Sequence, residues 1–211
     1  MDRNEIENIY KSKSLEEIPW NVETPPDALV ELVRSGQVKS SRCIDLGCGA
    51  GNYSIYMASQ GFEVTGVDLS PTAISRARKN AEKKGVTCTF LAADILGGLQ
   101  EVEGTFDFAF DWGVLHHIYP EKRNQYVATV HRILNPGGKY FSVCFSEKDT
   151  TFGGAGKYRQ TSLGTVLYFS AEDELRELFS RYFKVLDIKT REIQGKLTPH
   201  LVNAVFMEKV R

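Results

Sequence analysis

The 211-residue sequence has no hydrophobic run that approaches the roughly 20 apolar residues needed to cross a membrane. Its N-terminus is polar and acidic, without the apolar segment of a secretory signal. The formal net charge is only -1, so nothing in the charge balance favours a nucleic acid or a membrane surface. We therefore expect a cytoplasmic protein that acts on small molecules.

The sequence also lacks the spacing of a metal site or a disulfide framework. Its four cysteines form no C-x-x-C pair, and no carboxylate or cysteine stands at ligand spacing from the adjacent His116 and His117. We expect reduced thiols and no bound metal. The cysteines are Cys43, Cys48, Cys88 and Cys144.

Strand-like and helix-like patterns alternate from residue 42 onward, which is typical of a doubly wound sheet. The length suits one α/β domain. The pattern predicts strands at 42–46, 62–68, 86–91, 105–111 and 139–145, and helices at 52–60, 70–85 and 120–134.

The last part of the chain departs from this alternation. Residues 146–168 hold four glycines with little periodicity, and such a long loop predicts a lid over a site. A helix is expected from Ser170, where Ser170-Ala-Glu-Asp173 looks like a capping box. Strands at 183–190 and 200–209, joined by a short link, predict an antiparallel hairpin at the sheet edge.

Three glycines follow the first expected strand, at Gly47, Gly49 and Gly51, and Asp68 ends the second. Glycines at this turn let the backbone approach a ligand, and an acid at the next strand end can accept hydrogen bonds from ribose hydroxyls. A dinucleotide site wants G-x-G-x-x-G, but its third glycine position holds Asn52. Asp45 would repel a pyrophosphate and attract a cation. The pattern predicts a site for a cationic nucleoside.

This D-x-G-x-G-x-G arrangement resembles the first motif of class I S-adenosylmethionine-dependent methyltransferases. The resemblance implies a Rossmann-like methyltransferase fold: an α/β, doubly wound, mostly parallel seven-stranded sheet with helices on both faces and a C-terminal antiparallel hairpin. It also implies S-adenosylmethionine as cofactor and S-adenosylhomocysteine as product.

The same resemblance assigns cofactor contacts along the strand ends. Asp68 would take the ribose hydroxyls, Leu69 would pack on the adenine, and Asp94 would accept from the adenine amino group. Asp111 would lie beside the methionine portion. The complete implied set is Trp20, Asp45, Gly47, Cys48, Gly49, Gly51, Asp68, Leu69, Ala93, Asp94, Ile95, Asp111, Trp112 and Gly113.

Two further segments are similar to those of the thiol, halide and thiopurine S-methyltransferases and the tellurite-resistance group. One is Pro19-Trp20 followed by Pro25-Pro26. The other is Phe110-Asp111-Trp112-Gly113 with Pro120-Glu121-Lys122-Arg123 after it. The resemblance implies that residues 1–40 form an N-terminal helical cap segment over the cofactor site of a methyltransferase domain at 41–211.

Methyl transfer from a sulfonium is an in-line displacement, so the protein mainly aligns the acceptor and excludes water. A thiolate or halide needs no strong general base, whereas an oxygen or nitrogen acceptor would draw on His116 or His117. We assign no catalytic residue. The candidates for acceptor binding are Trp20, Trp112, His116, His117, Arg123, Tyr158 and Arg159.

The leading hypothesis is a methyltransferase of a small-molecule acceptor, such as a thiol, another chalcogen or a halide. An O- or N-methyltransferase of a metabolite is the alternative, and a non-catalytic S-adenosylmethionine-binding protein is a third hypothesis. Asn52 and the C-terminal hairpin disfavour a nicotinamide dehydrogenase. We expect no nucleic-acid or membrane partner, and either a monomer or a homodimer.

Overall fold

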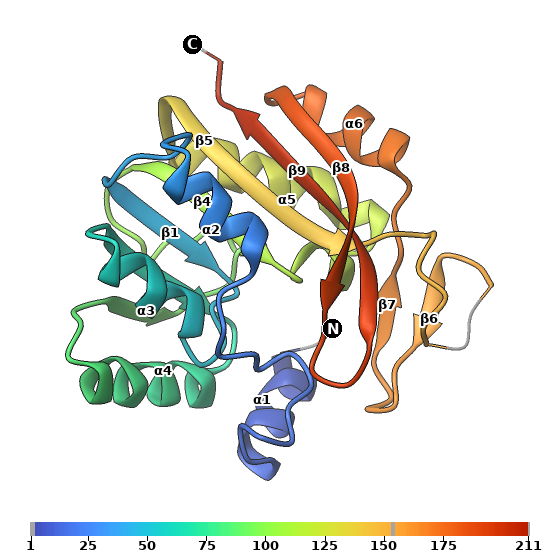
Figure 1. The fold of residues 1–211 in the computed structure, drawn as a ribbon, viewed down its shortest axis with the longest axis horizontal. Helices are drawn as coiled ribbons and strands as arrows, with labels where there is room; N and C mark the ends of the chain where they lie inside the picture. Colours follow the sequence, from blue (N-terminus) through green and yellow to red (C-terminus); the bar gives the residue numbers. More distant parts are fainter. Residues whose placement is uncertain (1–2, 153–154, 211) are drawn as a thin grey trace.

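A computed structural model describes residues 3–152 and 155–210 of the chain. Its centre is a seven-stranded sheet in the order β3-β2-β1-β4-β5-β9-β8, with helices on both faces (Figure 1). The predicted fold class is thereby confirmed. The strands of this sheet are β1 (Arg42–Leu46), β2 (Glu63–Asp68), β3 (Thr89–Ala92), β4 (Phe106–Trp112), β5 (Leu134–Phe145), β8 (Lys184–Gln194) and β9 (Pro199–Glu208).

Strands β3, β2, β1, β4 and β5 run parallel to one another, whereas β9 lies antiparallel between β5 and β8. The strand order reverses between β1 and β4, and ligands of open α/β sheets bind outside the carboxyl ends of the strands at such a switch. The helices are α1 (Arg3–Ser12), α2 (Asp27–Arg34), α3 (Asn52–Ser59), α4 (Pro71–Lys84), α5 (Pro120–Ile133) and α6 (Glu172–Ser180), with a 3-10 turn η1 (Leu115–His117).

Alternation along β1 and β4 divides the core between two helical layers. Cys43 and Phe108 are register partners and pack with α2 and α3. Ile44 and Ala109 are the next partners and pack with α5 and α6 on the other face. Because successive side chains of a strand point to opposite faces, the same parity decides which strand-end residues face which layer.

Several element boundaries differ from the prediction. Strand β3 begins at Thr89 instead of 86, and β5 begins at Leu134 instead of 139. Helix α6 begins at Glu172, after Ala171, whose N–H donates to the Glu174 carboxylate at 2.9 Å. Pattern reasoning places strand and helix ends with an error of a few residues, because the end depends on which backbone groups find partners.

The segment expected to be an irregular lid contains a small antiparallel sheet. Strands β6 (Tyr158–Gln160) and β7 (Val166–Tyr168) pair in it, and the bridge from Ser146 to Ser170 ties its base to β5. The prediction of a loop without secondary structure was therefore wrong, because three-residue strands are too short to show a periodicity. Gly153 and Gly154 of the predicted lid lie outside the described residues.

Helix α2 packs into the helical layer on the sheet, with Leu29 fully buried beside Phe206 and Val38. The stretch before it is different, because Tyr10 and Ile18 form a separate small cluster with Ala73 of α4. The division of the chain into a cap at 1–40 and a domain at 41–211 stays a prediction. Within residues 3–152 and 155–210, no helix is both long and apolar enough to cross a membrane.

Candidate functional site

The glycine loop joins β1 to α3 at the switch point of the sheet. Gly49 has φ +53°, and a Cβ built on it would lie 2.7 Å from the Tyr10 hydroxyl. Gly51 has φ +81° and is the N-cap of α3. Only glycine adopts such left-handed conformations without strain, so the loop leaves its backbone exposed to close approach.

Asp68 holds this loop in place from the end of β2. One carboxylate oxygen accepts from the Gly49 N–H at 2.9 Å, and the other accepts from the Ser70 N–H at 2.9 Å. Burial raises the pKa of Asp68, and these two backbone hydrogen bonds oppose the increase. A carboxylate has about four acceptor positions, so Asp68 retains capacity for a ligand's hydroxyl groups.

Asp45 lies beneath the loop, on the face of β1 that contacts α3. It is 3% exposed, and Ser54 donates a 2.6 Å hydrogen bond to it. Gly66 is its register partner on β2, and a side chain there would collide with Ser54. Burial raises the pKa of Asp45 to about 7, with Asp68 and Asp111 adding to the increase. The protein therefore places a weakly hydrated carboxylate beside the loop.

At the end of β4, the adjacent residues Asp111 and Trp112 point to opposite faces of the sheet. Trp112 is on the same face as Phe110 and lies near Tyr53 of α3, with ring centroids 6.0 Å apart. Asp111 is on the other face, is fully buried, and accepts a hydrogen bond from the Tyr140 hydroxyl. Burial raises the pKa of Asp111 to about 6. Its carboxylate contacts the core, so the predicted place of Asp111 beside the cofactor stays a prediction.

A cavity of about 40 Å³ lies between the glycine loop and the segment that follows α1. Six of the predicted cofactor or acceptor residues line it: Trp20, Asp45, Gly47, Cys48, Gly49 and Trp112. Six residues that were not predicted as site residues line it too: Tyr10, Asn21, Val22, Ala50, Asn52 and Tyr53. Gly51 is the N-cap next to this cavity.

The cover of the cavity comes from residues 10–22. From here on we call this stretch the cap, which is narrower than the cap segment predicted at 1–40. Trp20 donates from its indole nitrogen to the Tyr10 hydroxyl at 2.9 Å, and the two rings meet edge to face. Asn52 donates to the Asn21 side chain at 3.0 Å and to the Val22 carbonyl at 3.1 Å. The residue that breaks the dinucleotide motif is thus the anchor of the cap on α3.

The other predicted adenine and methionine contacts lie at neighbouring strand ends without lining the cavity. Asp94 is exposed and accepts from the Leu96 N–H at 2.9 Å. The Ala93 N–H donates to the Asp68 carbonyl at 3.0 Å. Leu69, Ile95 and Gly113 are half-buried. Their contacts with a cofactor stay predictions.

His116 and His117 occupy η1, directly after β4. The His116 ring stacks on Phe145, with centroids 4.5 Å apart. Burial lowers the pKa of His116 well below its usual value and lowers that of His117 to about 3. Both imidazoles are therefore neutral near pH 7 and are weak bases in this conformation.

The two predicted acceptor arginines are buried in contacts with the protein itself. Arg123 donates to the Ile118 and Leu115 carbonyls and, at 2.9 Å, to the Ser170 hydroxyl. Arg159 donates to the carbonyls of residues 147, 149 and 156 and packs over Phe169 at 4.0 Å. Tyr158 is 55% exposed on β6. None of these three lines the cavity, so acceptor binding by them stays a prediction.

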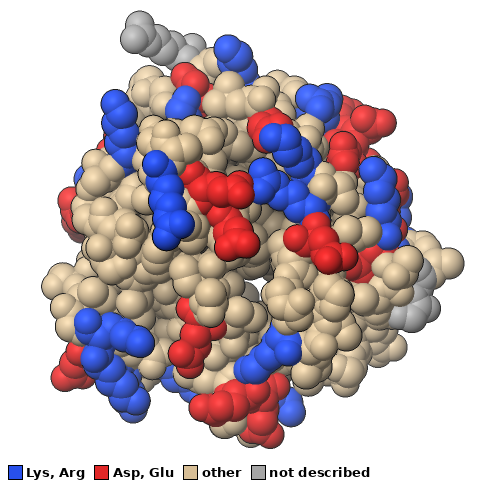
Figure 2. Space-filling model, in the orientation of Figure 1, with Lys and Arg blue, Asp and Glu red and all other residues tan. Residues whose placement is uncertain are grey.

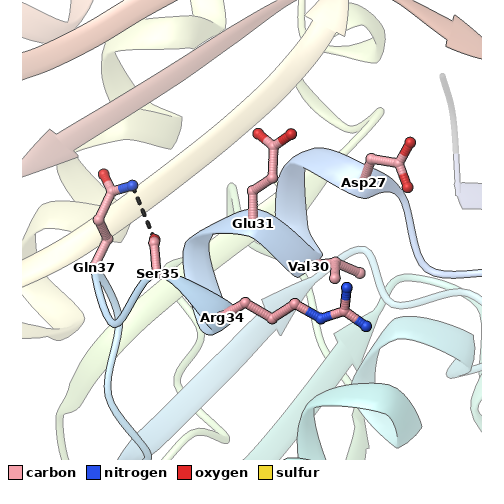
Figure 3. A pocket seen from close by; sticks show the side chains of 6 residues that line it. All are labelled: Asp27, Val30, Glu31, Arg34, Ser35 and Gln37. Carbon is pink, nitrogen blue, oxygen red and sulfur yellow. Dashed lines mark hydrogen bonds between the residues drawn. The ribbon is translucent and has the colours of Figure 1, made fainter.

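A larger hollow of about 590 Å³ lies over the outer surface of α2 (Figure 3). The side chains around it come from α2 and the turn after it, and Gln37 donates to Ser35 there at 3.1 Å. The lining contains no strand-end residue: it consists of Asp27, Val30, Glu31, Arg34, Ser35 and Gln37. We regard it as a surface depression beside a helix.

The residues at the switch point fit a cationic nucleoside cofactor. The glycines of the loop allow close approach of a ligand to the backbone. Asp45 and the rings of Trp20 and Trp112, which line the cavity, suit a positive charge. Asp68 does not line the cavity, but it holds the loop and keeps acceptor positions for hydroxyl groups. Among the described residues, no lysine or arginine that could hold a pyrophosphate lines this cavity. No group of three histidine, cysteine, aspartate or glutamate side chains able to hold a metal occurs within 3–152 and 155–210.

Comparisons with known proteins agree with this geometry. A family model described as a methyltransferase domain matches residues 43–138. A Schizosaccharomyces pombe protein described as an uncharacterized methyltransferase is 30% identical over 56% of this chain and 80% of its own length. The 2-heptyl-1-hydroxyquinolin-4(1H)-one methyltransferase of Mycobacteroides abscessus is 29% identical over 87% of this chain and 78% of its own length.

A solved structure also shares the fold across nearly the whole chain. It was described for the conversion of a disulfide bond into a thioacetal group during echinomycin biosynthesis. The TM-score is 0.83 at 24% identity, and the match covers 99% of this chain and 93% of the other. With the loop, the strand-end acids and the C-terminal hairpin in place, the chain belongs to the class I S-adenosylmethionine-dependent methyltransferases.

Proposed function

We propose that this enzyme methylates a small aromatic acceptor through a heteroatom that ionises by itself, such as an aryl thiol or an acidic heteroaryl hydroxyl. That it is an S-adenosylmethionine-dependent methyltransferase of small molecules follows from the family. The choice of acceptor class goes further and depends on the lining of the cavity.

The observation that carries the proposal is the composition of that lining. It contains the rings of Tyr10, Trp20, Tyr53 and Trp112, one carboxylate, and no cationic side chain among its described residues. Aromatic rings favour planar apolar groups. A free halide or tellurite ion would gain no protein cation there, so of the acceptors predicted from the sequence the thiols fit best.

The histidines support an acceptor that needs little help in losing its proton. His116 and His117 are neutral, and their lowered pKa values make them poor general bases at neutral pH. An ordinary alcohol or an ammonium group needs a stronger base than either histidine provides. A thiol or an acidic hydroxyl loses its proton to the solution and so needs no base from the protein.

Within this mechanism the chain mainly binds and orients. The cofactor supplies an electrophilic methyl group when bound, Asp68 and the loop would hold its nucleoside, and Asp45 would face its positive charge. Trp112 and Tyr53 would align the acceptor, and the cap would exclude water.

An acidic hydroxyl as the acceptor, and hence oxygen methylation, has the support of one relative. The M. abscessus protein is named for a hydroxyquinolone, a planar heterocycle with an acidic N-hydroxyl group. This compound is an organic heterocycle rather than a free inorganic ion, and it fits the proposed class. Cytoplasmic location and a monomeric or homodimeric state stay predictions.

The test is an acceptor panel with labelled S-adenosylmethionine, containing an aryl thiol, 1-hydroxyquinolin-4-one, an unactivated phenol, an amine, iodide and tellurite. We expect the largest kcat/KM for the thiol or the hydroxyquinolone, with a rate that rises with pH as the acceptor ionises. Faster turnover of iodide or tellurite than of either aromatic acceptor would refute the proposal. Labelled methyl transfer to none of the six would refute it too if the cofactor binds.

A further inference from the structure

The cap closes the proposed cofactor site more tightly than a cofactor allows. Tyr10, Trp20, Asn21 and Val22 cover the cavity, which has a volume of about 40 Å³. Sites for ligands of this size typically hold roughly 300 Å³ or more. The cap must therefore move away from the glycine loop whenever the cofactor enters or the product leaves.

The cap and its supporting helix are fastened to the domain at several places, one of which is a hydrogen bond from Arg76 of α4 to the Lys13 carbonyl at 2.8 Å. Glu7 of α1 accepts from the Ser70 hydroxyl at 2.5 Å and the Thr72 hydroxyl at 2.6 Å, at the start of α4. Asn52 holds Asn21 and Val22 at the start of α3. A further attachment comes from the opposite side of the site.

Lys196 makes that attachment from the tip of the β8–β9 hairpin. Its ammonium donates to the carbonyls of Leu15 at 3.1 Å, Ile18 at 3.3 Å and Asn21 at 3.4 Å. Three carbonyls of the segment 15–21 thus converge on a single cation. Glu16 lies in the same segment, and the positive charge of Lys196 contributes to lowering its pKa, after a local backbone hydrogen bond and one with Ser14.

This contact joins parts of the molecule that are otherwise on different sides of the site. Figure 1 shows the hairpin tip beside the chain that follows α1, while the glycine loop and α3 lie on the other side of that chain. Figure 2 shows an opening near the middle of this face. The Lys196 contact joins the hairpin to the cap.

We propose that Lys196 is a positioning residue that holds the cap against the glycine loop in the cofactor-free protein and thereby sets how fast the cofactor enters. Lys196 does not line the cavity, whereas Asn52 does. A change at Lys196 therefore acts on the ligand through the cap. The inference rests on the proposed cofactor site at the glycine loop.

The test compares Lys196→Met with Lys189→Met, a β8 lysine whose ammonium pairs with Asp187 at 2.7 Å. Association of S-adenosylhomocysteine is followed by stopped-flow tryptophan fluorescence. Hydrogen exchange of residues 10–22 is measured in the cofactor-free protein. Loss of hydrogen bonds from a charged donor predicts that association and cap exchange both become roughly tenfold faster in Lys196→Met, with little change in Lys189→Met. Lys196→Arg should restore most of the slow exchange.

We call the contact between Lys196 and the cap the clamp. The two measurements test the clamp separately from the proposed cofactor site. If cap exchange in the cofactor-free protein is the same in Lys196→Met and the parent, the clamp is refuted, whatever the ligand does. Faster exchange throughout the central sheet would also overturn it, because Lys196 would then support the fold as a whole. Failure of the parent protein to bind S-adenosylhomocysteine would refute the proposed site instead, while the exchange result would still decide the clamp.

Discussion

Replacing Asp45 with asparagine should weaken S-adenosylmethionine binding and, at the same time, remove a pH-dependent instability of the cofactor-free protein. The two effects have one cause, because a buried carboxylate is unfavourable until a cation faces it. Asparagine keeps an oxygen that can accept the Ser54 hydrogen bond, so the change removes charge with little change in shape.

The stability effect follows from the raised pKa. The pKa of Asp45 rises from the usual 3.8 to about 7. At about 1.4 kcal/mol for each pKa unit, this shift of roughly three units corresponds to up to about 4 kcal/mol in the free energy of unfolding. The folded state holds the proton more tightly than the unfolded chain does, so this group lowers the free energy of unfolding as pH rises from about 4 to about 7. Above that window the loss is constant. Asparagine does not titrate, so the variant escapes it.

The binding effect has the opposite sign. A unit positive charge about 5 Å from a carboxylate gains about 3 kcal/mol at an effective dielectric constant of 20. At pH 8 Asp45 is largely ionised before the ligand arrives. We therefore expect S-adenosylmethionine to bind roughly 10- to 100-fold more weakly to Asp45→Asn. Uncharged 5′-methylthioadenosine should bind both proteins about equally.

The assays are urea unfolding between pH 4.5 and 8 and calorimetric titration with both ligands at pH 8. Asp27→Asn, an exposed carboxylate on α2, is the control. The decisive quantity is the change with pH of the stability difference between variant and parent, because a fixed cost of burying the new amide cancels. Parallel pH profiles for parent and variant would refute the reasoning, as would equal losses of affinity for the charged and uncharged ligands.

Three further variants test the fold around the site. Gly49→Ala places a Cβ 2.7 Å from the Tyr10 hydroxyl at a left-handed φ. The free energy of unfolding should therefore fall by about 1 to 3 kcal/mol, and cofactor binding should weaken. Calorimetry that finds neither change would contradict the close packing of Gly49 against Tyr10. Arg123→Met removes a buried cation with three protein partners, so urea unfolding should show a loss of about 2 to 4 kcal/mol, whereas a fall in activity at unchanged stability would restore its predicted acceptor role. Partial burial alone would raise the pKa of Glu7, but hydrogen bonds from Ser70 and Thr72 outweigh it and lower the pKa to about 2. Docking of α1 should therefore weaken as pH falls from about 4.5 towards 2, seen as faster hydrogen exchange at 3–12, and Glu7→Gln should lose that dependence.

Much of the site could be predicted because it is built from local backbone geometry. The glycine loop, Asp45 and Asp68 lie within one strand–turn–helix–strand unit, whose conformation is determined by neighbouring residues. Strand parity would also have separated Asp111 from Trp112, since Phe108 and Phe110 already mark the face towards α3.

The partners of long side chains could not be predicted in this way. Arg123 and Arg159 reach backbone carbonyls and a hydroxyl that the fold brings to them, so a pattern that suggested acceptor contacts gave no sign of their internal hydrogen bonds. Tyr10 and Lys196 belong to no motif. Lys196 meets Leu15 across 181 residues, which only the return of the C-terminal hairpin makes possible.

The sequence by itself determined the fold class and the kind of cofactor, because periodicity, glycine positions and strand-end acids act through local backbone conformation and charge. Only the tertiary structure decided what covers the site, which charges are buried and which rings line the cavity. Those properties depend on contacts between segments distant in the chain, and such contacts exist only once the sheet has brought the segments together.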